Sequence, residues 1–185
     1  MRDVLSCLLN RHSVGPKWLV PPGPDRTALR IAAQAAMRAP DHGSLRPFRF
    51  AVVADRRRPA LADLFADFAR RAGASASEID AERERAYNGP TLVAVIARIV
   101  PDHEKVPAIE QWVCVGGALA NFVNALHLHG FGAKVLSGRK VTDPSVRAAF
   151  CADGESLVGW VLAGTASRAA RARGTDDPDA LLGDW

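Results

Sequence analysis

The chain has 185 residues, of which 48% are apolar and 24% are charged, and its formal net charge is +4. This composition predicts a single globular domain over residues 1–185 with a sizeable core, and it excludes a disordered chain. The mild positive charge suits an anionic small molecule better than nucleic acid, because the basic residues are scattered and a single tyrosine is available for base stacking. We expect no membrane partner, since no uninterrupted apolar run reaches about 18 residues.

Three cysteines, Cys7, Cys114 and Cys151, are far apart in the chain and form no C-x-x-C motif. They are predicted to be reduced, small apolar side chains. We see no secretory signal, because the apolar start VLSCLL is short and has no small-residue cleavage site behind it. A cytoplasmic location is therefore expected.

In the first part of the chain, the pattern predicts a short amphipathic helix at Asp3 to Asn10 and a proline-rich loop at Lys17 to Asp25. Asp25 is a good N-cap for a second helix. That helix must end near Ala39, because Pro40 disfavours the helical conformation in the residue before it.

The middle of the chain alternates strand and helix patterns. Phe48 to Ala54 is predicted to be a strand, followed by a helix at Pro59 to Ala72 and an exposed, charged helix at Ser77 to Tyr87. After a turn at Asn88 to Pro90, the β-branched and almost wholly apolar segment Thr91 to Val100 is predicted to be a strand buried on both faces.

The longest helical pattern runs from Pro107 to His129 and contains Gly116 and Gly117. Each glycine costs about 1 kcal/mol of helix stability relative to alanine, so we expect close packing there, against another subunit or within one subunit.

The last elements are predicted as a strand at Lys134 to Gly138, a helix at Pro144 to Phe150 and a strand at Leu157 to Thr165. No structure is assigned to the tail from Ala166 onwards. Because helices and strands mix without regular βαβ alternation, the predicted fold class is α+β.

Three kinds of chemistry find no support in the motifs. No metal site is expected: His127 and His129 are two residues apart and point about 200° from each other on a helix. The sequence has no G-x-S-x-G for a hydrolase, and neither of the common phosphate-binding loops. We therefore expect no catalytic side-chain nucleophile.

Two polar clusters remain, NRHS at Asn10 to Ser13 and AMRAPDHGSLRPFRF at Ala36 to Phe50. Arg11 could form two parallel hydrogen bonds to a phosphate, with Ser13 adding a hydroxyl donor. Alternatively, Arg11 could cap the C-terminus of the first helix, where a cation is favoured. Likewise, the second cluster could be a well-capped loop without a ligand, and the spacing leaves both alternatives open.

These clusters, together with KVPAIEQ, HGFGAKVLSG and LVGWVLAGT, resemble the nitroreductase superfamily, and more narrowly its small YdjA-like branch of NAD(P)H nitroreductases. The resemblance runs in order from about Leu5 to Thr165. It implies an α+β nitroreductase-like fold with a central mixed or antiparallel sheet flanked by helices. It also implies an intertwined homodimer that binds FMN at the subunit interface.

The resemblance further implies which residues contact the cofactor. The family's Arg-Arg-Ser beside the flavin falls on Arg11, His12 and Ser13. The arginine and histidine of the RAPDH motif fall on Arg38 and His42, which are expected to reach the flavin of the other subunit.

The flavin contacts that follow GFG in the family fall on Val135, Leu136 and Ser137. This chain departs from the family there, since Val135-Leu136 replaces a Trp-Arg pair and removes one aromatic ring and one charge. In the first motif, His12 replaces the second arginine. A nicotinamide-dinucleotide contact region is implied for Ala125, Leu126, His127, Leu128, His129 and Gly130.

The implied activity is two-electron transfer from NADH or NADPH through FMN to nitroaromatic, quinone or related small-molecule acceptors. Flavin N5 would carry the chemistry, with hydride donor and acceptor using the same slot in a ping-pong order. Two alternatives stay open: a flavin-binding storage or sensing protein without efficient turnover, and an enzyme of the same fold with different flavin chemistry. The sequence does not define the physiological acceptor or a preference for NADH or NADPH.

Overall fold

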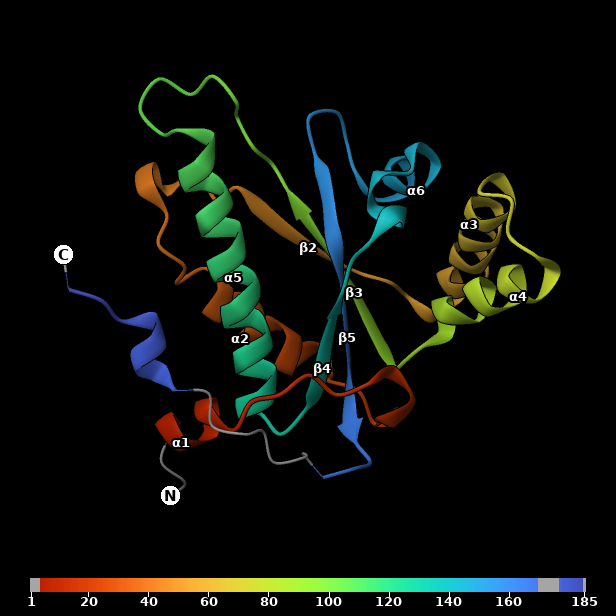
Figure 1. The fold of residues 1–185 in the computed structure, drawn as a ribbon, viewed down its shortest axis with the longest axis horizontal. Coiled ribbons are helices and arrows are strands. Elements are labelled where there is room, and N and C mark those ends of the chain that lie inside the picture. Colours follow the sequence, from red (N-terminus) through yellow and green to blue (C-terminus); the bar gives the residue numbers. More distant parts are fainter. Residues whose placement is uncertain (1–3, 170–176, 185) are drawn as a thin grey trace.

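The computed structural model describes residues 4–169 and 177–184, and an antiparallel β-sheet forms its centre (Figure 1). Strand β5 (Ser156–Ala166) is the central strand and pairs with β3 (Thr91–Ala97), β4 (Gly132–Leu136) and the two-residue β1 (Leu19–Val20). Strand β2 (Phe48–Val52) pairs with β3. Every ladder among the described residues is antiparallel, and an isolated bridge between Ser13 and Ala133 adds a parallel contact.

Helices cover both faces of this sheet (Figure 1). On one side lie α2 (Arg26–Ala36) and α5 (Ala108–Leu128), with the short α1 (Val4–Leu9) against α5. On the other side lie α3 (Arg58–Arg71), α4 (Ala76–Glu84) and α6 (Pro144–Phe150). The α+β prediction is confirmed.

Strand β3 separates two hydrophobic clusters, as its apolar sequence predicted. Val93 and Val95 pack toward α2 and α5, whereas Leu92, Ala94 and Ile96 pack toward α3 and α6. Since successive side chains of a strand point to opposite faces, a continuous apolar run supplies both clusters.

Most element boundaries follow local signals, and two follow long-range contacts. Asp25 caps α2 as predicted, accepting a hydrogen bond of 2.8 Å from the backbone N of Ala28. The loop predicted over Lys17 to Asp25 was wrong in one part, because it contains β1, which forms by pairing with the end of β5. Strand β3 ends three residues before Val100, because the buried Gln111 side chain holds both backbone polar groups of Val100, at 2.8 and 2.9 Å.

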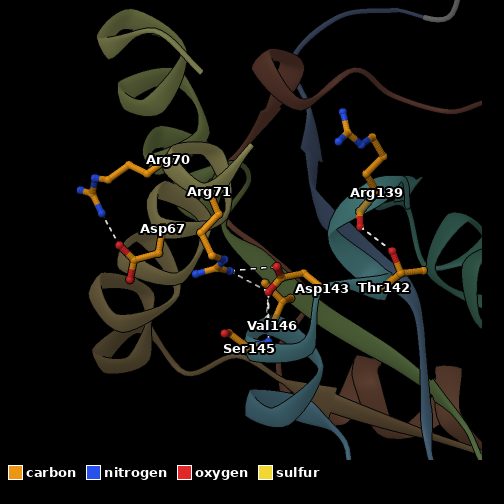
Figure 2. A network of polar contacts seen from close by, with 8 residues as sticks. All are labelled: Asp67, Arg70, Arg71, Arg139, Thr142, Asp143, Ser145 and Val146. Carbon is orange, nitrogen blue, oxygen red and sulfur yellow. Dashed lines mark hydrogen bonds and ion pairs between the residues drawn. The ribbon is translucent and has the colours of Figure 1, made fainter. Parts of the chain in front are cut away.

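The segment that follows β4 is fixed by a polar network (Figure 2). Both carboxylate oxygens of Asp143 accept from Arg71 of α3, at 2.9 and 2.8 Å. One of these oxygens also accepts from the backbone N of Val146 at the start of α6. Just before it, a 3₁₀ turn at Arg139–Thr142 is closed by a 2.9 Å hydrogen bond from the Thr142 hydroxyl to the Arg139 carbonyl. The 3₁₀ turn therefore has a defined position beside α3.

No structure was predicted from Ala166 onwards, but Ala166 is the last residue of β5. Further on, a 3₁₀ turn forms at Pro178–Leu181, and residues 170–176 lie outside the described part of the chain.

Candidate functional site

Asp41 shapes the loop between α2 and β2. Its carboxylate accepts hydrogen bonds from the backbone N of Leu45, at 3.1 Å, and of Arg46, at 2.9 Å. Gly43, Ser44 and Arg46 all have positive φ values, of 72°, 54° and 48°. Left-handed backbone is costly for non-glycine residues and persists where the surroundings determine it, often at ligand sites.

This loop presents Arg38 and His42 to solvent. His42 Nδ1 lies 2.8 Å from the Glu110 carboxylate, at the first turn of α5. Within the described part of the chain, the Arg38 guanidinium has no hydrogen-bond or ion-pair partner. Both predicted side chains therefore sit beside the N-terminal half of α5 and point outward.

The NRHS cluster lies on the opposite end of α5, alongside β4. The backbone N of Val14 donates to the Ala133 carbonyl at 3.0 Å, so the segment runs parallel to the strand. Arg11 and Ser13 line a cavity of about 260 Å³ between β4 and α5, which we call the α5 cavity. Its other lining residues are Gly116, Leu119, Ala120, Val123, Asn124, Ala133 and Val135.

The structure bears on the two roles considered for Arg11. At the end of α1, the Ser6 carbonyl accepts from the Asn10 side chain at 2.8 Å, and the Leu8 carbonyl accepts from the backbone N of Arg11 at 3.0 Å. Among the described residues, the Arg11 guanidinium bonds to no carbonyl of α1. The capping role is thus filled by Asn10, and the guanidinium is left beside the cavity.

Leu136 and Ser137 line a different cavity, of about 170 Å³, which we call the Lys140 cavity. It lies among side chains of the core cluster on the α3 side of the sheet. Its walls are Pro16, Phe65, Arg85, Asn88, Leu92, Lys140, Trp160 and Leu162. The predicted trio is therefore divided, because neighbouring residues of β4 point to opposite sides.

The His12 side chain does not share the α5 cavity with its sequence neighbours Arg11 and Ser13. It lines a third cavity, of about 540 Å³, together with His127, Leu128 and Gly130. His127 Nε2 lies 2.9 Å from the Cys7 carbonyl. Within the region predicted for a nicotinamide dinucleotide, Ala125 and Leu126 are buried in the core and His129 is exposed.

Three polar residues of the Lys140 cavity were not predicted from the sequence: Arg85, Asn88 and Lys140. Arg85 and Asn88 belong to a charged helix end and a turn, and Lys140 follows Ser137 by three residues without forming a known motif. The fold brings them together from positions about fifty residues apart.

In the described ranges 4–169 and 177–184, no group of three or more His, Cys, Asp or Glu side chains is placed to hold a metal ion. Over the same residues, no helix is both long and apolar enough to cross a membrane.

The α+β core thus carries a cavity on each side of β4, and at one of them, the α5 cavity, the Arg11 and Ser13 side chains have no hydrogen-bond or ion-pair partner among the described residues. The chain belongs to the nitroreductase family, whose model matches residues 8–165, and it is an oxidoreductase. It is 34% identical over 164 residues to an Escherichia coli protein named "Putative NAD(P)H nitroreductase YdjA", a match covering 88% of both chains.

Solved structures share the fold at lower identity. The nitroreductase-like family protein of Bacillus cereus superposes with a TM-score of 0.80 at 16% identity, covering 100% of this chain and 97% of its own. The FMN and NADPH-dependent nitroreductase NfnB of a Sphigopyxis strain, in a point-mutant form, gives a TM-score of 0.71 at 20% identity, covering 99% and 98%.

Proposed function

We propose that this protein is an FMN-dependent NAD(P)H oxidoreductase that passes two electrons to nitroaromatic, quinone or related acceptors in a ping-pong order. The observation that carries the proposal is the α5 cavity: within the described ranges, the Arg11 guanidinium and the Ser13 hydroxyl that line it have no hydrogen-bond or ion-pair partner. The names of the relatives, which include an FMN and NADPH-dependent nitroreductase, support the same conclusion. The three unpaired cysteines agree with a cytoplasmic location.

The residues present fit an FMN molecule in the following way. Arg11 and Ser13 would bind the phosphate through the guanidinium and the hydroxyl. A Cβ built on Gly116 would meet nothing within 4 Å, so the helix surface at the cavity is open. Bound FMN would supply hydride acceptance from NADH or NADPH and electron delivery to the acceptor.

One chain does not form a complete site. The α5 and Lys140 cavities, at about 260 and 170 Å³, are each smaller than the roughly 300–1,000 Å³ usual for ligand pockets. Arg38 and His42 also lie outside the α5 cavity: along α5, Glu110, which holds His42, is about 9 Å from Gly116 and about 21 Å from Asn124, the first and last helix residues of the cavity lining, at a rise of about 1.5 Å per residue. We infer that a second copy of the chain completes each site.

The exposed face of α5 fits such a second copy. Ile109, Trp112 and Val113 are 71%, 42% and 62% exposed, and Gly116 and Ala120 continue the same stripe at helical spacing. In a two-fold pair, residues equidistant from the axis lie opposite each other. An axis near Gly116 would therefore place His42 and Arg38 of one copy near the Arg11 cavity of the other, as the family resemblance implied.

The first test is the visible absorption spectrum of the purified protein, with and without added FMN. We expect flavin bands that bleach when NADPH is added without oxygen, because hydride transfer reduces the flavin. A protein that takes up no FMN would contradict the proposal. A bound flavin that NADPH and NADH fail to reduce would instead support a storage or sensing role.

Substituting Arg11→Ala tests the phosphate anchor. Loss of a charge-assisted bidentate contact should weaken FMN binding by about 10- to 100-fold. The matched control is Arg30→Ala, which removes an exposed arginine of α2. FMN titration followed by flavin fluorescence would give both dissociation constants, and equal values for the two variants would exclude the anchor role.

A further inference from the structure

The segment KVPAIEQ, at Lys105 to Gln111, forms the start of α5 and the three residues before it, beside the loop that carries His42. Its last residue, Gln111, is 2% exposed. The Gln111 amide N donates to the carbonyls of Val100 and Val106, at 2.9 and 3.0 Å, and its amide O accepts from the backbone N of Val100 at 2.8 Å. A buried amide with these bonds made fixes the path of the chain into α5.

Val106 packs against the His42 loop. It is 2% exposed, and a Cβ built on Gly43 would lie 3.4 Å from Val106 Cγ2. On the other side of His42, the Asp41 carboxylate accepts from two backbone N–H groups of the same loop. The backbone of His42 therefore lies between two residues whose positions are fixed.

The Glu110 carboxylate decides which nitrogen of His42 faces outward. His42 Nδ1 lies 2.8 Å from Glu110 Oε2, and an ionised carboxylate can only accept a hydrogen bond. Nδ1 must therefore carry a proton, which leaves Nε2 free to contact another group. The two side chains are 60% and 46% exposed, so their pairing adds little to folding stability. Its effect is on the orientation of the ring.

We propose that Glu110 is a positioning residue: it holds the His42 imidazole with Nδ1 protonated, so that Nε2 is presented to the flavin bound by a second copy of the chain. This inference rests on the proposed function, in which His42 reaches FMN across the subunit interface. Nε2 accepts a hydrogen bond in the neutral ring and donates one in the protonated ring. Because the ring is oriented before FMN arrives, binding loses less side-chain entropy.

The tautomer of His42 tests the orientation directly. It is measured from long-range proton–nitrogen correlation spectra of the histidine rings at about pH 9, where histidine is neutral. In the wild type, His42 should carry its proton on Nδ1. Glu110→Ala removes the acceptor, so this preference should be lost, whereas Glu110→Gln keeps an oxygen acceptor and should retain it. The control is Glu104→Ala, which removes an exposed carboxylate just before α5 and should match the wild type.

A double-mutant cycle on FMN affinity tests whether Glu110 acts through His42. Glu110→Ala should weaken FMN binding about fivefold, the effect of ordering one side chain, and Glu110→Gln should restore most of this loss. His42→Ala should weaken binding at least as much, and adding Glu110→Ala to it should cause no further loss. Glu104→Ala should bind FMN like the wild type.

The outcomes separate this inference from the proposed function. An unchanged His42 tautomer in Glu110→Ala, an FMN affinity equal to that of Glu104→Ala, or additive losses in the double variant would each overturn the role of Glu110. The proposed function would stand in all three cases, because the wild type would still bind FMN. A wild-type protein that takes up no FMN would overturn both.

Discussion

Glu155 holds one end of the sheet together through contacts that are long-range in sequence. Arg49 of β2 donates to both of its carboxylate oxygens, at 2.7 and 2.5 Å. The backbone N of Ala152 donates at 2.8 Å, and Arg98 lies at 3.2 Å. Hydrogen bonding from Arg49 is the main cause that lowers the pKa of Glu155 to about 2, from an ordinary value of 4.5.

This shift makes folding stability depend on pH. Because the folded pKa lies below the unfolded one, the stabilisation is complete above about pH 4.5 and is lost as the pH falls toward 2. Between pH 5 and pH 2, wild-type protein should lose about 2 to 3 kcal/mol more unfolding free energy than Glu155→Gln.

Urea denaturation at several pH values measures this difference. Asp153→Asn, two residues away and exposed, is the control and should keep the pH dependence of the wild type. A Glu155→Gln protein that loses stability with acid as steeply as the wild type would argue against the ion pair as its source.

At the scale of elements, α5 uses its two adjacent glycines for different purposes. A Cβ on Gly117 would lie 3.3 Å from the Cβ of Ala39, so this glycine allows the loop that follows α2 to pack closely against α5 within one subunit. Gly116 faces outward at the α5 cavity. Of the two packing alternatives predicted for this pair, the within-subunit one holds for Gly117, and a subunit contact is left for Gly116.

Leucine at each position should separate these roles. Gly117→Leu should destabilise the fold by about 1 to 3 kcal/mol through overpacking. Gly116→Leu should leave the unfolding free energy unchanged or raise it by up to about 1 kcal/mol, because a helix-breaking residue is removed. It should nevertheless block FMN binding. Denaturation and FMN titration measure the two effects, and normal FMN affinity in Gly116→Leu would contradict this assignment.

Periodicity and capping residues were enough to predict the helices and the longer strands, because those signals are local. Strand β1 was missed because two residues become a strand only through their partner, the end of β5. The end of β3 was missed because it depends on the contact between Val100 and Gln111, which is eleven residues beyond Val100. At the site, Arg11 and Ser13 could be predicted from chemistry, whereas Arg85 and Lys140 become neighbours only when α4 and the segment after β4 pack together.

For the whole molecule, the exposed apolar stripe on α5 sets the expected assembly. Monomeric proteins rarely expose contiguous apolar patches of this kind, and the α5 cavity opens on the same helix. We therefore expect cofactor binding and dimer formation to be coupled.

Val113→Glu tests that coupling. A charge at the centre of the stripe should shift the protein to monomers at micromolar concentration and weaken FMN binding at least tenfold, while circular dichroism stays unchanged. Sedimentation velocity and FMN titration provide the measurements. Val52→Glu, an exposed valine on β2, is the control and should remain dimeric; a Val113→Glu protein that is still dimeric would rule out this face as the interface.

Strand β4 carries Val135 toward the α5 cavity and Leu136 toward the Lys140 cavity. Each position can therefore change in size or polarity while acting on one cavity alone, which lets two properties of the protein diversify separately. A change in the length of the strand has a different effect. Because side chains alternate, one inserted or deleted residue would exchange the two cavities' linings at once. Natural variants of this strand should accordingly differ in residue type far more often than in length.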